Sequence, residues 1–344
     1  MILHTKGGGV LIHGALVGAK VRTLTLVGLI VVCLVAIAVY SEGNVHPLVH
    51  GHMVKTLFQS IVWEAFPFIL FGSILSSLIE TWVGANHLSA LLSDSMTGRL
   101  AASMVGLVVP VCDCGTIPVA RTFRRKGVGE SVAFTFALAT PTLNLIALIS
   151  TFIAFRQQLG FVLLRAGSAL IIALVTGIAV YLQEEGLTEK WNVKYSEDHH
   201  HTQKGFAKWR HAAEHSVDEL FTVGPFFVIS ALFAAVAQGL WPLKVVTAFT
   251  QHSIWSIVLL MVLGSAFSLC SEADAFVAAS LTTLFSPGAV MAFLLAGQMI
   301  DVRNIFLMPQ VFSKRTMVVG LPLAAMMIFA FALLVNRFLT GGWV

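Results

Sequence analysis

Two short polar motifs interrupt long apolar stretches of this chain. The first, "PVCDCGTIP" (110–118), holds two cysteines on either side of an aspartate, and the second, "CSEAD" (270–274), holds a cysteine and two acids. Thiols select soft ions and thiophilic metalloids, whereas carboxylates suit protons or harder cations. A Cys-x-Cys pair is too short for the usual spacing of a structural zinc site. The motifs therefore indicate a site on the path of a solute or an ion.

Structural interpretations of the same residues stay open. Free cysteine behaves as a small buried hydrophobe, so Cys112 and Cys270 could be packing residues. The acids could form structural ion pairs with Arg121 or Arg303. Which interpretation holds depends on the elements that position the two motifs.

The composition is that of a polytopic membrane protein. Of the 344 residues, 57% are hydrophobic and only 11% are charged, and the mean hydropathy is +0.87. We therefore expect an all-α polytopic membrane protein, made of helices rather than a barrel. The pI near 9.0 comes from basic residues in short loops, which is typical of membrane topology and not of nucleic-acid binding. The four cysteines do not form the framework of a secreted disulfide protein.

Seven apolar runs are long enough to cross the ~30 Å hydrocarbon core of a bilayer. They lie near residues 24–40, 57–79, 131–155, 160–182, 217–240, 289–311 and 316–336. Residues 183–215 form the one substantial hydrophilic linker. Two further apolar regions, 97–124 and 254–284, contain the polar motifs.

The basic residues favour a re-entrant hairpin for each interrupted region. The first region has too few apolar residues on either side of its motif for two full crossings. If it crossed once, the basic loop 124–126 would lie outside, against the positive-inside rule. With hairpins and a cytoplasmic N-terminus, most of the 21 basic residues lie inside.

The two halves of the chain resemble each other, which predicts an internal duplication. Three pairs share a separation of 158 residues: Pro67 with Pro225, Gly106 with Gly264, and Cys112 with Cys270. With a slip of two residues, "TPTLN" (140–144) pairs with "IDVRN" (300–304). Three crossings and one hairpin per half make the copies run in opposite directions, as in many secondary transporters. The predicted parts are an N-terminal tail with the first transmembrane helix (1–50), repeat 1 (51–182), a cytoplasmic linker (183–215) and repeat 2 (216–344).

Inverted repeats form substrate sites where broken helices and hairpin tips meet near the bilayer midplane. Acids at the centre of a membrane helix cost ~2.5–3.5 kcal/mol each on insertion scales, so they usually mark a substrate or ion path. The candidate substrate-binding residues are Cys112, Asp113, Cys114, Thr116, Asn144, Cys270, Glu272, Asp274, Asp301 and Asn304. The candidate metal-ligating thiols are Cys112, Cys114 and Cys270. The residues expected to break helices are Pro110, Gly115, Pro118 and Pro141.

The stretch "PVCDCGTIPVARTFRRKGVGESVAFTFALATPTLN" (110–144) resembles the predicted-permease family, whose best-known branch is the ArsP-type organoarsenical permeases. "LCSEADAFVAA" (269–279) is similar to members described as subunits of two-component membrane permease complexes. The resemblance covers roughly residues 55–340 and implies a bacterial cytoplasmic-membrane permease without an ATPase of its own. The residues that carry it are Pro110, Cys112, Cys114, Gly115, Pro118, Pro141, Asn144, Cys270, Glu272 and Asp274. The arsenical-exporting branch tends to have serine at the positions of Asp113 and Gly115, which makes a cation a more plausible substrate here.

From these observations we expect a permease, a secondary transporter that moves a soft metal, a metalloid or a related small thiophilic solute. Export is favoured by family analogy alone. The alternative is a non-autonomous membrane subunit of a two-component permease complex, for example for a divalent metal such as zinc. An intramembrane enzyme is disfavoured, because the chain lacks H-E-x-x-H and G-x-S-x-G motifs.

The expected partners are membrane lipid and a small solute or ion. A second permease subunit and a homo-oligomer both stay open, and neither nucleic acid nor a cofactor is expected. We expect a multi-pass protein of the bacterial cytoplasmic membrane with a cytoplasmic N-terminus.

Overall fold

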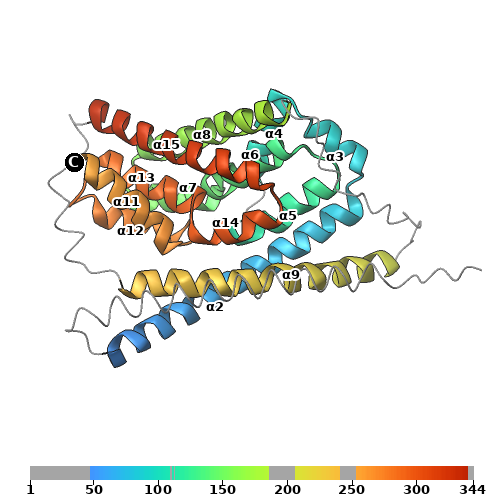
Figure 1. Ribbon diagram of the computed structural model, residues 1–344, viewed down its shortest axis with the longest axis horizontal. Helices are drawn as coiled ribbons and strands as arrows, with labels where there is room; N and C mark the ends of the chain where they lie inside the picture. Colours follow the sequence, from blue (N-terminus) through green and yellow to red (C-terminus); the bar gives the residue numbers. More distant parts are fainter. Residues whose placement is uncertain (1–46, 109–110, 112, 186–205, 241–252, 340–344) are drawn as a thin grey trace, which may run out of the picture.

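The computed structural model describes residues 47–108, 111, 113–185, 206–240 and 253–339, and the regular structure in these ranges is helical (Figure 1). The first predicted span, 24–40, lies outside them. The helices of the first half are α2 (Pro47–Trp82), α3 (Ala85–Leu91), α4 (Met96–Val108), α5 (Asp113–Arg125), α6 (Glu130–Leu143), α7 (Leu145–Ala154) and α8 (Leu159–Glu185). Those of the second half are α9 (Phe206–Leu240), α11 (Ser253–Phe267), α12 (Ala273–Leu281), α13 (Pro287–Met299), α14 (Val302–Leu307), the 3₁₀ turn η1 (Met308–Gln310) and α15 (Lys314–Leu339).

Six helical segments of the described chain are long and apolar enough to cross a membrane. They are Met53–Trp82, Glu130–Ala154, Leu159–Gln183, Leu220–Gln238, Pro287–Gln310 and Lys314–Phe338. They coincide with six of the seven predicted runs, so the expectation of a multi-pass, all-helical membrane protein is confirmed. Helices α8 and α9 extend into both ends of the predicted linker, and residues 186–205 between them lie outside the described chain.

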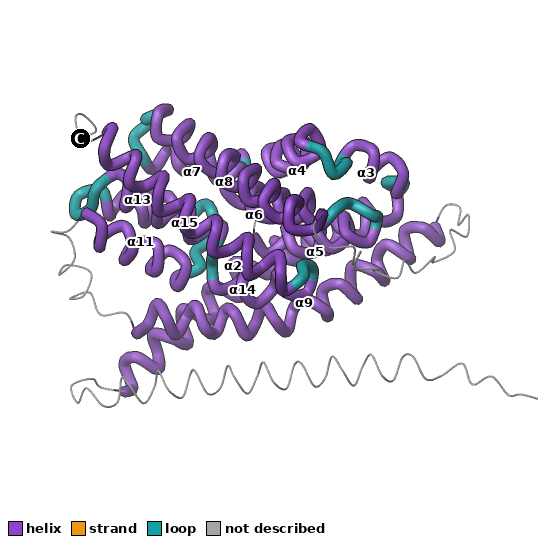
Figure 2. The backbone as a smooth tube through the Cα atoms, turned by 45° about the horizontal axis from the view of Figure 1, so that its top comes forward, coloured by secondary structure: helices purple, strands orange, loops and turns teal. Residues whose placement is uncertain are grey.

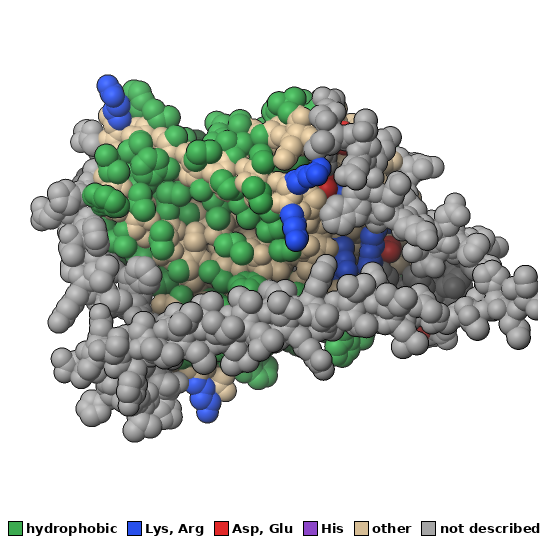
Figure 3. All heavy atoms as spheres, in the orientation of Figure 1, with side chains coloured by type: hydrophobic (Ala, Val, Ile, Leu, Met, Phe, Trp, Pro, Cys, Tyr) green, Lys and Arg blue, Asp and Glu red, His purple; other side chains and the backbone are tan. Residues whose placement is uncertain are grey.

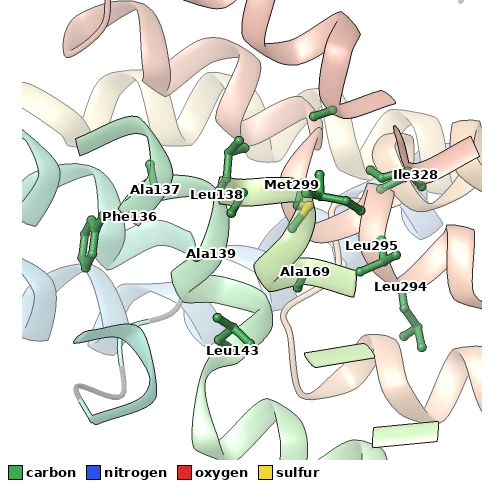
Figure 4. Packing of buried hydrophobic residues seen from close by; sticks show 14 of the residues in the cluster. Phe136, Ala137, Leu138, Ala139, Leu143, Ala169, Leu294, Leu295, Met299 and Ile328 are labelled. Atoms are coloured by element: carbon green, nitrogen blue, oxygen red, sulfur yellow. The ribbon is translucent and has the colours of Figure 1, made fainter. Parts of the chain in front are cut away.

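Two helices, α6 and α13, form the centre of the bundle. Every residue of α6 is buried, as are residues 288–299 of α13, because other helices pack around both. They contact each other, and each also packs against a longer outer helix, α6 against α8 and α13 against α15. Figure 4 shows Leu138 of α6 close to Met299 of α13, with Ala169 of α8 near Met299.

The outer helices present apolar side chains to the surroundings. Helices α2 and α9 lie side by side along one edge of the bundle (Figures 1 and 2). Large side chains such as Trp63, Phe221 and Phe338 remain 74–78% exposed. In a membrane protein, such a surface faces lipid.

Each interrupted region folds into two short helices, α4 and α5 in the first half and α11 and α12 in the second. The first break is shorter than predicted, because α5 begins at Asp113 and continues through Gly115 and Pro118. Pro141 likewise lies inside α6, two residues before its last residue, Leu143. A proline removes only one helical hydrogen bond, and membrane helices tolerate this loss when neighbouring groups pack against them. Gly115, Pro118 and Pro141 therefore do not break helices, while Pro110 lies outside the described residues.

The start of α4 and the end of α5 lie at the same end of the bundle. Arg99, in the first turn of α4, donates to Ser131 Oγ at 3.3 Å, and Arg124, at the end of α5, pairs with Glu130 at 3.1 Å. Since Ser131 and Glu130 are neighbours at the start of α6, α5 returns to the end from which α4 departs. We name this the basic end. Lys126 lies there too and donates to the carbonyl oxygens of Glu80 and Val83 at the end of α2.

The long helices of the first half, α2 and α8, run antiparallel to those of the second half, α9 and α15 (Figure 1). In Figure 1, α2 runs from left to right and α9 from right to left, and the same reversal relates α8 to α15. The start of α15 lies at the basic end, because Glu130 accepts hydrogen bonds from Ser313 N and Thr316 Oγ1 at 2.6 Å. Figure 3 shows hydrophobic side chains over the middle of the surface and most visible Lys and Arg side chains towards the right.

Candidate functional site

The second polar motif lies in a turn between α11 and α12 that is held by backbone and side-chain contacts. Ser268 has a φ of 48°, in the left-handed region that non-glycine residues rarely adopt. Its hydroxyl donates to Asp301 Oδ2 at 2.8 Å. This contact joins the turn to the break between α13 and α14, so the tip and the broken helix form one structure.

Asp274, in the first turn of α12, is buried beside a buried arginine. Arg165 of α8 pairs with its Oδ2 at 3.0 Å, and the two side chains are 0% and 2% exposed. Gln298 Nε2 donates to the same oxygen at 2.7 Å, and Thr151 of α7 accepts from Arg165 Nη1 at 2.6 Å. Four helices, α7, α8, α12 and α13, thus meet at this carboxylate.

A second buried ion pair closes the break between α13 and α14. Arg303 Nε donates to Asp301 Oδ2 at 3.0 Å, and Arg303 Nη2 donates to the carbonyl of Leu269 at 2.9 Å. Asp301 caps α14 by accepting from Asn304 N at 2.8 Å, and Asn304 Nδ2 donates to the carbonyl of Gln298 at 3.1 Å. The negative ends of α11 and α13 are therefore compensated by a fixed cation and an amide.

Cys270 points towards the other side of the turn and meets α2. Its thiol donates to Glu64 Oε1 at 2.6 Å, although 206 residues separate them. Glu64 is exposed, and Cys270 and Glu272 are half-buried. A thiol beside a carboxylate in an accessible position suits the binding of a cation or thiophilic solute.

The first polar motif can be placed only through its flanking residues. Cys112 lies outside the described chain, and for Asp113 and Cys114 only the backbone, at the start of α5, is described. Thr116 is buried. A Cβ added to Gly115 would lie 3.2 Å from Cα of Gly72 and 3.3 Å from the carbonyl oxygen of Phe68. The start of α5 is therefore pressed against α2.

The structure brings some of the predicted residues together and leaves others apart. Asp274, Asp301 and Asn304 lie in one hydrogen-bonded region around Gln298. Asn144 lies at the other break, where its Oδ1 accepts from Ile146 N at 3.0 Å and caps α7.

Several predicted residues have structural partners. Arg303 pairs with Asp301 of the broken helix, and Asp274 of the second motif pairs with Arg165, which is neither of the two arginines expected for it. Among the described side chains, no three His, Cys, Asp or Glu residues gather closely enough to hold a metal ion.

Arg165 and Thr151 are functional candidates that the sequence does not single out as site residues, whereas the sequence already offers Glu64, an acid inside the second predicted span, as a conduction group or an ion-pair partner. For Arg165 and Glu64 the signal is a charge inside an otherwise apolar run, since each stands in a predicted span. For Thr151 the sequence offers no signal, because threonines in such helices usually bond to their own turn.

Comparison with known proteins identifies a family to which the chain is similar. Residues 50–337 match the family described as "Predicted permease". A Streptococcus mutans protein named as a two-component membrane permease complex subunit is 34% identical over 283 residues, covering 81% of this chain and 94% of that protein. The UPF0718 protein YcgR of Bacillus subtilis is 33% identical over 286 residues, covering 82% and 96% respectively. No solved structure matches the chain.

Proposed function

This chain belongs to the predicted permease family, and we propose that it is a secondary transporter of the bacterial cytoplasmic membrane rather than an enzyme. Its substrate is a small thiophilic solute, a soft metal ion or a metalloid, and export is the favoured direction. The solute passes between the tips of two re-entrant hairpins. Cys112, Cys114 and Cys270 contact the solute, while Asp113, Glu272 and Asp274 handle charge or protons.

The observation that carries this proposal is the approach of both tips to one stretch of α2. Cys270 of the second tip bonds to Glu64, and Gly115 beside the first tip packs on Phe68 and Gly72. Glu64 and Phe68 are one helical turn apart, about 6 Å along the axis. A half-buried thiol and an exposed acid therefore lie about one turn from the start of α5, near the middle of a helix long enough to span the membrane.

The arrangement of the helices supports an inverted repeat with re-entrant hairpins. The order of long and short helices in α2 and α4–α8 resembles that in α9 and α11–α15, with opposite directions (Figure 1). In each half a glycine of the hairpin packs on the broken helix, Gly106 on Thr140 and Gly264 on Gly297. The return of α5 to the basic end favours a hairpin, because α4 has only 13 residues, about 20 Å, too short to span the hydrocarbon core. We assign repeat 1 to 51–182 and repeat 2 to 216–344.

The positive-inside rule supports a cytoplasmic basic end. This end holds Arg124, Arg125, Lys126, Lys314 and Arg315. The linker 183–215 then lies in the cytoplasm, and so does the N-terminus if the first apolar run crosses once. A tag inserted at 124–126 should be accessible only from the cytoplasm, and labelling from outside would refute the orientation.

Transport by the purified chain in proteoliposomes tests the function. Uptake of Zn²⁺, Cd²⁺ and trivalent arsenicals should fall at least about tenfold in Cys112→Ser and Cys270→Ser, since each loses a soft ligand. Cys33→Ser, in the first apolar run, is the matched control and should transport normally. Normal transport of all these solutes by the Cys112→Ser/Cys270→Ser double variant would eliminate the thiol site.

A second function is favoured by one of the relatives. The Streptococcus mutans protein is named as a subunit of a two-component complex, so this chain could require a second permease subunit and transport nothing alone. Robust transport by the purified chain would refute this alternative. A chain that is folded but inactive until a co-purifying membrane protein is added would support it.

A further inference from the structure

Polar groups at the break between α6 and α7 have no hydrogen-bond partner among the residues that the structure describes. The hydroxyls of Thr140 and Thr142, both 0% exposed, find no hydrogen-bond partner within the described chain. Threonines inside helices usually donate to the carbonyl four residues earlier, and Thr135, Thr151 and Thr176 do so here. A buried hydroxyl without a hydrogen-bond partner lowers the stability of the fold by about 1–3 kcal/mol. We therefore expect these two hydroxyls to bind a ligand.

The backbone at the same place also has unused acceptors. The last four carbonyls of an α-helix have no intrahelical donor, and none of the cap or turn hydrogen bonds of the described chain ends on residues 140–143. Pro141 has no N–H, which leaves the carbonyl of Ala137 without its usual donor. Neutral oxygen atoms are thus concentrated at the end of α6.

Two helix ends of the same polarity meet here. Gly106 in the last turn of α4 packs on Thr140 in the last turn of α6, where an added Cβ would lie 2.6 Å from its Cα. Both helices start at the basic end, so both carboxyl ends point into the protein. Each end carries about half a negative charge. Together they favour about one positive charge.

The second half of the chain shows how such an end can be neutralised. There the guanidinium of Arg303 donates to the carbonyl of Leu269 just beyond α11, and Asn304 donates to the carbonyl of Gln298. In the pairing of "TPTLN" with "IDVRN", Leu143 stands where Arg303 stands. The first half therefore has the acceptors but lacks both the arginine and its partner Asp301, because Pro141 stands where Asp301 stands.

We propose that an exchangeable alkali-metal cation occupies the end of α6 in place of that guanidinium. Its ligands are the hydroxyls of Thr140 and Thr142 and the free carbonyls of residues 140–143. Hard cations prefer oxygen ligands, and sites for divalent cations usually contain carboxylates. A site built from neutral oxygens at helix ends therefore suits Na⁺, as in the broken helices of transporters. Coupling of this ion to transport rests on the proposed function, whereas its binding does not.

Binding of ²²Na⁺ to the purified full-length chain at constant ionic strength, with choline as the inert cation and Li⁺ and K⁺ as competitors, tests the site. We expect saturable binding, weakened at least about tenfold in Thr142→Val and Thr140→Val, because each removes a ligand to a charge. Thr142→Ser retains the hydroxyl and should bind as the wild type does. Leu143→Arg supplies the missing guanidinium and should abolish binding while the protein remains monodisperse.

Several outcomes would overturn the proposal. They are the absence of saturable binding, equal affinity of the valine variants and the wild type, and equal loss in Thr142→Val and Thr142→Ser. If Leu143→Arg does not fold, the valine and serine pair still decides the question. Cys270→Ser should bind ²²Na⁺ normally, so a failure of the thiol site leaves this result unaffected.

Discussion

The ion pair between Arg165 and Asp274 should be the most sensitive single contact in the bundle. Both side chains are almost fully buried, with exposures of 0% and 2%, and their closest atoms are 3.0 Å apart. Removal of one member of a buried pair leaves an uncompensated charge and costs about 3–5 kcal/mol. Native proteins have only about 5–15 kcal/mol of stability in total, so Arg165→Met alone should sharply reduce the folded yield.

The double variant should recover most of that loss. In Arg165→Met/Asp274→Asn no buried charge remains at this site, and replacing a whole buried pair by neutral groups of similar volume is often close to neutral. Gln298 keeps a polar partner in the asparagine, since its Nε2 lies 2.7 Å from Asp274 Oδ2 in the native protein. The double-mutant cycle should therefore give a coupling energy of about 2–4 kcal/mol.

The measurement is the thermal unfolding midpoint in detergent, followed by fluorescence-detected size exclusion after heating. The single variant should unfold roughly 5–15 °C below the double variant, given a few degrees per kcal/mol in chains of this size. If Arg165→Met is as stable as the double variant, the burial argument fails. Transport by the double variant then distinguishes a structural role of Asp274 from a role in transport. A folded but inactive protein would assign Asp274 to solute or proton handling.

Three further predictions concern stability, each read as the same thermal midpoint. Glu130→Ala should cost about 1–3 kcal/mol, because Ser313 N loses its acceptor, whereas Glu130→Gln should lose less. Lys126→Met should leave two backbone carbonyls without a donor. Burial holds the pKa of Lys126 below its ordinary value of 10.5, so raising the pH from the lowered pKa towards 10.5 should stabilise the wild type but not the methionine variant. Gly72→Ala should destabilise by forcing α2 from α5, whereas Gly167→Ala, where an added Cβ meets nothing within 4 Å, is the control; equal midpoints would contradict the close packing.

The spans and the two interruptions could be predicted from the sequence because hydropathy alone sets them. Apolar runs of sufficient length become helices in a bilayer regardless of their partners. The extent of the first break was predicted wrongly at Gly115 and Pro118, since a helix can contain both residues when a neighbour packs against it. Gly72 of α2 supplies that neighbour, and no local pattern reveals such a contact.

The partners of the buried charges could not be predicted for a similar reason. Arg165 and Asp274 are 109 residues apart. The sequence contains several other acidic and basic residues that could pair with either of them equally well. The choice depends on which helices pack together, which is a property of the whole bundle. The comparison of the two halves was more informative, because it paired "TPTLN" (140–144) with "IDVRN" (300–304), and both segments lie at breaks between helices, where Asn144 caps α7 and Asp301 caps α14.

The distance between Arg165 and Asp274 along the chain also affects how the protein is made. At about 5–20 residues per second, the ribosome completes Arg165 roughly 5–20 s before its partner exists. During that interval the guanidinium has no carboxylate, and a charge held alone in lipid is costly. Helix α8 must then wait near the headgroups, with Arg165 reaching towards water, until α12 has been synthesised. We therefore expect the final docking of α8 to follow the synthesis of α12.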